Sequence, residues 1–402
     1  MSKTIAINSG SSSLKFALYE MPEEVLLASG LIERIGDEKA TFKIETPTIK
    51  LNDIRKVEDH KVAVDIILEA LLEHNVINSA DDIEYIGHRV VHGGEKFKTS
   101  VVITDKVIEG IDELSDLAPL HNPMNLMGIK VINEKCHNAK SVAVFDTAFH
   151  QTMPKEAFVY PTPYEWYEKY SVRKYGFHGT SHRFIAHRTQ EILAQNDRYL
   201  KIISAHIGNG ASICAIKNGE SINTTMGLTP LAGITMGTRS GSIDPAIIEF
   251  ISEKEERSIS YVIKKLNKGS GLLGISGISN DGRDIREGIK NGIERCKLAF
   301  DIQVNSIVKA ISYYYVLLEG ADVIVFTAGA GENDKYLRKA VCDKLKIVGV
   351  NLSEERNNNV SGETLISMDD SPVKVMVIPT QEELMVARDA YYVSNMENNI
   401  KD

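Results

Sequence analysis

The strongest constraint on the fold is one segment pattern that occurs twice, far apart in the chain. Residues 4–19 read TIAINSGSSSLKFALY, and residues 201–216 read KIISAHIGNGASICAI. Each is an apolar strand pattern, then a loop of Asn, Gly and Ser, then a second strand, with Asn8 and Asn209 in matching places. The similarity indicates two related domains, although two short apolar strands can also be alike by chance.

The segments between and after these two patterns alternate between strand and helix periodicity, which predicts the α/β class. A stretch rich in Pro and aromatic residues, 154–175, has little periodicity and is the expected boundary between the two halves. Asn122 is expected to cap one helix, and Thr380 with Glu383 has the spacing of a capping box for the last one. Further strands are expected at 28–35, 85–91 and 141–145, and helices at 62–72 and 123–134.

Composition excludes several classes of protein. The net charge is −9, from 46 basic and 55 acidic residues, whereas a non-specific binder of nucleic acid or anionic membranes usually carries the opposite balance. The 4 cysteines form no C-x-x-C pair, and no apolar run approaches the ~20 residues of a membrane span. The first residues enter a strand pattern directly, without a signal-peptide core. We therefore expect a soluble cytoplasmic protein with neither a nucleic-acid nor a membrane partner.

Gly-rich loops are the first candidate functional feature. The segments 9–13, 208–212 and 329–333 each follow an apolar strand, and small residues there let backbone N–H groups approach an oxyanion. Three such loops favour a phosphate cradle over three plain turns, although none is a Walker A motif. GSGLLG at 269–274 matches G-x-G-x-x-G but follows a Lys/Asn-rich segment, so we expect a loop there and no dinucleotide fingerprint.

Isolated charged residues at the ends of apolar segments are the second feature. Arg89 ends a buried strand, where it pairs either with an internal carboxylate or with a ligand carboxylate. Arg239 lies in a Gly/Ser segment, and its fork suits a carboxylate or a phosphate. Asp146 follows another buried strand, in a position for catalysis, for Mg²⁺ or for capping the next helix. His178 begins a predicted helix and could donate to an oxyanion.

Two histidine pairs, His88/His92 and His178/His182, have i, i+4 spacing. On a helix this spacing could hold a metal, but the first pair reads as strand plus turn, and neither has an acidic third ligand nearby. We expect neither pair to bind a metal.

The motifs taken together resemble the acetate kinase family, within the acetate and sugar kinase/Hsp70/actin superfamily. The resemblance extends over essentially the whole chain, in family order. Its motifs are NSGSSSLKF, GHRVVHGGEKF, PLHNP, FDTAFH, YGFHGTSH, HIGNGAS, GTRSGSIDP, SNDGRDIR, FTAGAGEN and TQEEL.

This resemblance implies two duplicated ribonuclease H-like (actin-like ATPase) domains with ATP in the cleft between them. They would span residues 1–150 and 151–382, with a last helix at about 383–402 packing back on the first domain. It also implies reversible transfer of the ATP γ-phosphoryl to acetate by direct in-line displacement, giving acetyl phosphate and ADP. The cofactor would be Mg²⁺, with Mn²⁺ as an alternative, and the protein would be a cytoplasmic homodimer.

The resemblance also assigns roles to individual residues. Arg89 would hold the acetate carboxylate, Asp146 would be the catalytic acidic residue, and His178 and Arg239 would stabilise the transferring phosphoryl. Asn8 and Glu382 would serve Mg²⁺. Val91, Leu120, Phe177 and Pro230 would form the apolar pocket for the substrate methyl group. The nucleotide-binding residues would be Lys15, His206, Gly208, Asn209, Gly210, Asp281, Gly282, Arg283, Gly329, Ala330, Gly331 and Asn333.

Three positions depart from the family pattern. Gln381 stands where Asn is usual, Ala330 where a bulkier apolar residue is common, and Gly282 where a Phe-like residue is expected. Since the last two lie in nucleotide-binding segments, nucleotide preference is less constrained than the transfer chemistry.

Three other activities remain open at this point. A propionate or other short-chain carboxylate kinase would share nearly all the motifs. A non-catalytic nucleotide-gated module would share the Gly loops but would not need Arg89, His178 and Arg239 together. A nicotinamide-dependent dehydrogenase would need a better-placed fingerprint.

Overall fold

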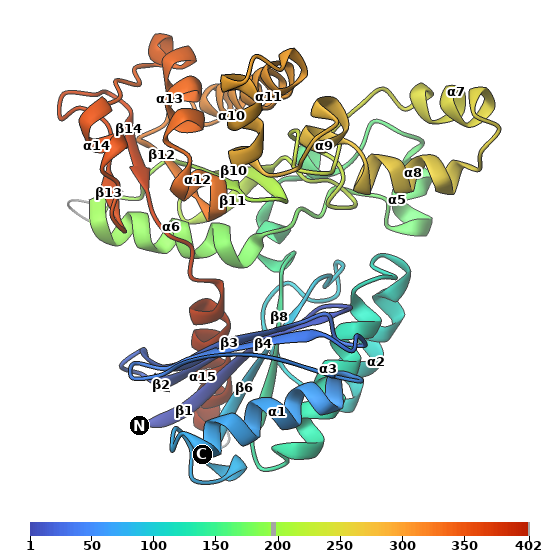
Figure 1. The fold of residues 1–402 in the computed structure, drawn as a ribbon, viewed down its shortest axis with the longest axis vertical. Coiled ribbons are helices and arrows are strands. Elements are labelled where there is room, and N and C mark those ends of the chain that lie inside the picture. Colours follow the sequence, from blue (N-terminus) through green and yellow to red (C-terminus); the bar gives the residue numbers. More distant parts are fainter. Residues whose placement is uncertain (194–197, 401–402) are drawn as a thin grey trace. The chain divides into compact units, whose positions relative to one another are not determined.

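The computed structural model describes residues 1–193 and 198–400, the side chains of 397–400 excepted. It divides into two compact units (Figure 1). Unit 1 is Met1–Phe149 together with the chain from Gln381 onward, and unit 2 is His150–Thr380. Each unit is built on one mixed β-sheet, so the predicted α/β class is confirmed.

The sheet of unit 1 contains eight strands in the order β5-β4-β3-β2-β1-β6-β8-β7. β1 is antiparallel to β2 and parallel to β6, and β6 is parallel to β8. The strands are β1 (Ser2–Ser9), β2 (Ser13–Met21), β3 (Val25–Glu33), β4 (Ala40–Glu45), β5 (Lys50–Arg55), β6 (Ile83–Val90), β7 (Val101–Val102) and β8 (Lys140–Phe145).

The helices of unit 1 pack on this sheet. Alternate residues of β1, Ile5 and Ile7, join a buried cluster with α1. α15 packs on β1, β6 and β8, where a Cβ at Gly87 would meet Val386 at 2.6 Å, so this strand position requires glycine. The helices are α1 (His60–Glu73), α2 (Asp105–Glu113), α3 (Asn122–Lys135) and α15 (Glu382–Ile400), with 3₁₀ turns Ala80–Asp82 and Leu114–Asp116.

The sheet of unit 2 contains six strands in the order β11-β10-β9-β12-β14-β13. β9 is antiparallel to β10 and parallel to β12, and β12 is parallel to β14. The strands are β9 (Ile202–Ile207), β10 (Ala211–Lys217), β11 (Glu220–Thr224), β12 (Val323–Thr327), β13 (Thr364–Leu365) and β14 (Lys374–Val377).

The helices of unit 2 include α6 against β9 and α11 against β10. α9, α10 and α11 share a small apolar cluster around Leu272 and Ile285. The helices are α4 (Lys155–Phe158), α5 (Tyr164–Tyr170), α6 (Gly179–Leu193), α7 (Ala246–Lys254), α8 (Ile259–Lys268), α9 (Gly271–Ser276), α10 (Gly282–Lys290), α11 (Glu294–Leu317), α12 (Ala328–Asn333), α13 (Lys335–Lys344) and α14 (Glu354–Asn358), with 3₁₀ turns Ala148–Thr152, at the junction of the two units, and Lys346–Val348.

The two sheets share one topology. The order β3-β2-β1-β6-β8-β7 in unit 1 corresponds strand by strand to β11-β10-β9-β12-β14-β13 in unit 2. The strand directions also agree, including the antiparallel edge pairs β7·β8 and β13·β14. This agreement favours duplication over chance as the origin of the repeated sequence pattern.

Two predictions from the sequence were wrong, one about the repeat and one about the last helix. Asn8 lies within β1, paired with Lys15, whereas Asn209 lies in the loop beyond β9, so the two asparagines are not equivalent. The capping box is also absent, because the Thr380 hydroxyl donates to Ser181 and the Glu383 carboxylate pairs with Lys15.

None of the helices in the described ranges combines the length and the apolar character that a membrane span requires.

Candidate functional site

In unit 1, polar side chains gather at the carboxyl ends of the three central strands. Asn8 is the penultimate residue of β1, Arg89 is the penultimate residue of β6, and Asp146 directly follows β8. Because these strands are parallel neighbours, their carboxyl ends lie at one edge of the sheet. The Asp146 N–H donates to the Val90 carbonyl at 2.9 Å, which continues the ladder and fixes the carboxylate at that edge.

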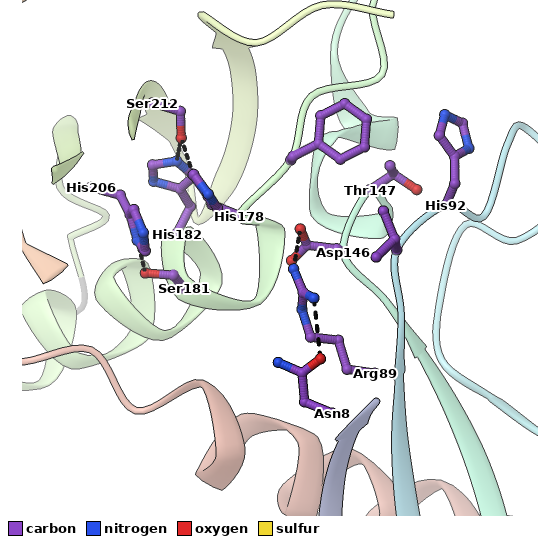
Figure 2. A network of polar contacts seen from close by, with 12 residues as sticks. Asn8, Arg89, His92, Asp146, Thr147, His178, Ser181, His182, His206 and Ser212 are labelled. Atoms are coloured by element: carbon purple, nitrogen blue, oxygen red, sulfur yellow. Dashed lines mark hydrogen bonds and ion pairs between the residues drawn. The ribbon is translucent and has the colours of Figure 1, made fainter. Parts of the chain in front are cut away.

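Arg89 is the centre of this group (Figure 2). Its Nη2 lies 3.0 Å from Asp146 Oδ2, and its Nη1 donates to Asn8 Oδ1 at 3.4 Å. The Asp146 side chain is 1% exposed, and a carboxylate so buried needs a cationic partner. Burial lowers the pKa of Arg89, but Asp146 and Glu382 more than offset this effect. The guanidinium therefore stays charged. Of the two partners that the sequence left open for Arg89, an internal carboxylate or a ligand carboxylate, the structure shows the internal one.

Glu382 opens α15 and borders a small pocket with Asn8, Arg89 and Glu383. Burial raises the pKa of Glu382 to about 7; Asp146 and Glu383 act in the same direction, and Arg89 and Lys15 act against it. Lys15 is 2.5 Å from Glu383, so the structure places this predicted nucleotide residue in an ion pair of unit 1.

The donor atoms of this group suit a hard divalent cation. Asn8 offers an amide oxygen, and Asp146 and Glu382 offer carboxylates, which are the ligand types that Mg²⁺ takes. Within the described part of the chain, no group of three or more His, Cys, Asp or Glu side chains is arranged to hold a metal by itself. Mg²⁺ would therefore need further ligands from water and from substrate phosphates, as is usual for this ion.

The loop after β6 carries Val91, one of the residues predicted to line the methyl pocket. Its N–H donates to Asn125 Oδ1 at 3.1 Å, and the next N–H, of His92, donates to Asn122 Oδ1 at 3.2 Å. Asn122 is thus a buried clamp on this loop and not the predicted cap of α3, whose N-cap is His121. Val91 is 8% exposed, whereas the Leu120 side chain is 70% exposed.

In unit 2, three histidines form a cluster that serine hydroxyls and ring stacking hold together (Figure 2). His178 Nδ1 lies 2.9 Å from Ser212 Oγ, which also lies 2.8 Å from His182 Nε2. His182 Nδ1 in turn lies 2.9 Å from Ser204 Oγ. His178 precedes α6 with φ +57, a strained conformation for a non-glycine residue that is common at functional sites.

His206 completes the cluster. Its ring stacks on that of His178 with centroids 4.0 Å apart, and its Nδ1 lies 2.8 Å from Ser181 Oγ. Burial lowers the pKa of His182 well below its usual value, and neighbouring histidines add to this effect. His182 is therefore neutral at physiological pH, so one of its nitrogens donates and the other accepts.

Arg239 lies beside this cluster. A methyl group added at Gly210 would lie 3.3 Å from Arg239 Nη1 and 3.5 Å from His178 Nε2, so the two side chains flank one point of backbone. Arg239 Nη1 also donates to the Pro230 carbonyl at 3.1 Å, and burial lowers the pKa of Arg239. Phe177, next to His178, is 4% exposed.

A pocket of about 410 Å³, here called the large pocket, lies wholly within unit 2. Its volume is in the range typical of small-molecule and cofactor sites. It brings together eight of the predicted nucleotide residues, namely Gly208, Asn209, Asp281, Gly282, Arg283, Gly329, Ala330 and Asn333. Sequence reasoning missed its other lining residues, which are Leu272, Asn280, Arg286, Gln303 and Asp334.

Two backbone segments shape this pocket. The loop after β9 is braced by Asn209, whose Oδ1 accepts from Asn280 Nδ2 at 2.9 Å, and a side chain at Gly237 would collide with that oxygen. The segment after β12 was predicted as a loop but is the short helix α12, entered through Ala328 at φ +65. Glu332 Oε1 accepts from Ala328 N at 2.8 Å and holds this sharp turn.

The remaining predicted residues lie outside the lining of the large pocket. His206 is in the histidine cluster, Gly210 is beside Arg239, and the Gly331 carbonyl accepts from the buried Arg338 at 3.0 Å. The GSGLLG segment follows helix α8 and mostly forms α9, so it has neither the predicted loop nor the strand that a dinucleotide fingerprint needs.

Comparison with known proteins covers the whole chain. The acetokinase family profile matches residues 3–388. An acetate kinase of Bacillus thuringiensis subsp. konkukian (strain 97-27) is 52% identical over 397 residues, which is 99% of this chain and 100% of that protein. The crystal structure of Porphyromonas gingivalis acetate kinase has a TM-score of 0.93 and 43% identity, covering 98% of this chain and 100% of that one.

A propionate kinase from Francisella tularensis subsp. tularensis SCHU S4 is similar to almost the same degree, with a TM-score of 0.92 and 40% identity over 97% of this chain and 99% of that one. The fold inferred from the motifs, two sheets of the duplicated actin-like ATPase type, agrees with these neighbours. The profile match spans both units and every cluster described above, and the chain belongs to the acetokinase family.

Proposed function

We propose that this protein is an acetate kinase, which transfers the γ-phosphoryl group of ATP reversibly to acetate and yields acetyl phosphate and ADP. The observation that carries the proposal is the family match, because it spans both units and relatives named acetate kinase match along their full length. In this proposal the two compact units are the two domains. Unit 1 supplies the groups for acetate, and unit 2 supplies the groups for the nucleotide.

The nucleophile needs orientation and no base. A carboxylic acid with a pKa near that of Glu, about 4.3, is already an anion at neutral pH. Arg89 binds its carboxylate and presents one oxygen for in-line attack, which is a proximity effect. Support comes from the charged guanidinium, which already holds one carboxylate oxygen of Asp146 at 3.0 Å.

Asp146 and its neighbours then serve the metal. Asn8, Asp146 and Glu382 would hold Mg²⁺ and its waters, with Mn²⁺ as an alternative, since all three offer oxygen ligands. When bound, the ion neutralises charge on the β- and γ-phosphate oxygens. Asp146 organises this site and removes no proton from acetate, because acetate has none to lose.

His178 and Arg239 stabilise the transferring phosphoryl group, whose equatorial oxygens carry the spread negative charge. Their positions on either side of Gly210 support a common target. The serine bridge also supports the needed tautomer. If His182 donates from Nε2 to Ser212, then Ser212 donates to His178 Nδ1, and the proton of His178 resides on Nε2, the nitrogen that faces Gly210.

The nucleotide would bind in the large pocket, with backbone N–H groups of the segments after β9 and β12 near the phosphates. Lys15 and His206 would contribute to nucleotide binding from outside that lining.

The pocket for the substrate methyl group would be lined by Val91, Leu120, Phe177 and Pro230. Propionate is the second candidate acceptor, favoured by the similarity to the propionate kinase, since one methylene changes discrimination by only ~1–3 kcal/mol.

The test is to trap the acyl phosphate with hydroxylamine, offering acetate, propionate and butyrate with ATP and Mg²⁺. We expect the largest specificity constant with acetate, and we expect one ADP to form for each acyl phosphate. Preference for propionate would move the protein to the second candidate, and no acyl hydroxamate from any acid would refute both.

We also propose a cytoplasmic homodimer, as the resemblance implies. Exposed aromatic and aliphatic side chains on α5 and α7 support a partner surface on unit 2, among them Trp166, Tyr170 and Phe250. The four cysteines, all within the described ranges, are buried free thiols, as suits a reducing compartment. Light scattering during size-exclusion chromatography tests the dimer, and a mass equal to one chain would refute it.

A further inference from the structure

The inference concerns which nucleotide this protein accepts, and it rests on the proposed function. Gln303 lines the large pocket, and no contact within the fold explains why a glutamine stands at this position. It lies on α11 with 6% of its surface exposed, among apolar neighbours Ala299, Val304 and Ile307 of the same helix. Its backbone carbonyl accepts from Ser306, but its side-chain amide makes no hydrogen bond within the described residues.

Neither polar atom of the Gln303 amide is both fully buried and without a partner, so the amide reaches the open space of the pocket. Burying a polar group without a partner costs about 1–3 kcal/mol, so a helix position that faces only the protein core would favour an apolar residue. The Gln303 amide instead borders the large pocket. The side chain therefore points to a bound group that both donates and accepts hydrogen bonds.

The surroundings of Gln303 fit a base better than a phosphate. Leu272 also lines the pocket, and it belongs to the apolar cluster that α9 and α10 share with α11, the helix that carries Gln303. The glycine segments after β9 and β12, with Gly210 between Arg239 and His178, supply the anion-binding end. Phosphates therefore belong at the glycine end and the flat, mostly apolar base at the α9–α11 end.

A planar cation also borders the pocket. Arg286 is ion-paired with Asp334, whose other oxygen accepts from the N–H groups of Tyr336 and Leu337 at the start of α13. A Cβ at Gly282 would lie 3.3 Å from Arg286 Nη1, so the glycine leaves the guanidinium open where the family usually has a bulky residue. A guanidinium held this way offers a stacking surface for a heterocycle.

We propose that Gln303 reads the Watson–Crick edge of a purine, and that it accepts both adenine and guanine. An amide carries one donor group and one acceptor, and a rotation of half a turn exchanges them. One orientation accepts from the adenine N6 amino group and donates to N1; the other donates to guanine O6 and accepts from N1–H. ATP and GTP should thus serve as phosphoryl donors with specificity constants within about tenfold of each other.

The experiment compares wild type with Gln303→Glu and Gln303→Leu, using ATP and GTP as donors at saturating acetate and Mg²⁺. A carboxylate only accepts, so Gln303→Glu should favour guanine, which presents two N–H donors, and shift the GTP to ATP ratio upward by about tenfold or more. Gln303→Leu should lower kcat/KM for both donors about tenfold, mainly through KM, and leave their ratio near the wild-type value.

The matched control is Asn305→Asp, the same amide-to-acid change on the exposed side of the same helix, and it should move neither quantity. An unchanged acetate KM and thermal unfolding midpoint show that each variant is folded. If Gln303→Glu leaves the donor ratio unmoved, or if Gln303→Leu uses both donors as well as wild type, Gln303 does not read the base.

Calorimetric titration with ADP and GDP gives the same comparison without catalysis and also applies to a variant that is inactive. It separates the two proposals. Wild type that makes no acyl phosphate but binds ADP and GDP with affinities that follow the Gln303 variants would refute the acetate kinase assignment alone. Acyl phosphate formation with an unmoved base preference would refute the role of Gln303 alone.

Discussion

Glu382 offers a prediction in which stability and function change in opposite directions. The fold raises its pKa from 4.5 to about 7, chiefly by burial. Below the lower value the carboxyl is protonated in both the folded and the unfolded chain. As pH rises through this interval, the folded chain holds the proton more tightly, so the metal-free protein loses stability. At 1.36 kcal/mol per pKa unit, the loss is complete above about pH 7 and amounts to about 3 kcal/mol.

Glu382→Gln removes this titration. Without metal, and with EDTA present, the variant should match wild type only near or below pH 4.5, and it should become progressively more stable than wild type as the pH rises toward 7. Hydrogen exchange followed by mass spectrometry can locate the effect, because peptides from β1, β6 and α15 report on unit 1 and peptides from α11 provide an internal control. Wild type and variant are compared at the same pH, because the intrinsic exchange rate of an amide depends on pH and is then the same for both proteins. Amides that exchange by global opening of unit 1 should be protected up to about 10²-fold more in the variant at about pH 8.

The same variant should lose Mg²⁺-dependent transfer, since it removes a proposed metal ligand. Equal protection of wild type and variant above neutral pH would refute the reasoning, because it would mean that the fold does not hinder ionisation of Glu382. A difference in protection between variant and wild type that is largest at acidic pH would refute the direction of the pKa shift assigned to Glu382.

Three further substitutions probe other parts of the mechanism. Asp146→Asn should lose activity that rising pH does not restore and should need more Mg²⁺; recovery at high pH with an unchanged Mg²⁺ requirement would make Asp146 a base. Val91→Ala should raise the specificity constant for propionate relative to acetate by up to ~1–3 kcal/mol in free energy, and an unchanged ratio would remove Val91 from the methyl pocket. Ser212→Ala breaks the bridge between His178 and His182, so kcat should fall about tenfold with little change in either KM; an unchanged kcat would show that the bridge does not set the tautomer.

The parts of the site that sequence could predict are those where a polar residue interrupts an apolar strand. Arg89 and Asp146 follow this rule, because Arg89 lies near the end of β6, Asp146 directly follows β8, and burial of a charge requires a partner. Sequence left open whether the partner was internal or a ligand. The structure pairs the two with each other, a contact that depends on β6 and β8 lying side by side.

Contacts between distant segments account for what sequence reasoning missed. Asn122 precedes a proline and has the residue type of a helix cap, yet its amide holds the backbone of His92. On sequence alone the spacing of His178 and His182 suggests only a metal site, because the serine that bridges the two rings comes from the distant strand β10. The only hint of Gln303 in the sequence is a polar residue among the apolar residues of the buried face of α11, and only the position of the pocket explains it.

The central claim is that the acetate held by Arg89 and the phosphoryl group held by His178 and Arg239 belong to one transfer. A crystal structure with ADP, acetate, Mg²⁺ and aluminium fluoride, which imitates the phosphoryl group in flight, tests this most directly. The account predicts that Arg89 binds the acetate carboxylate while His178 Nε2 and the Arg239 guanidinium both donate to the equatorial fluorides. Acetate bound away from Arg89, or a metal fluoride that touches neither His178 nor Arg239, would contradict it.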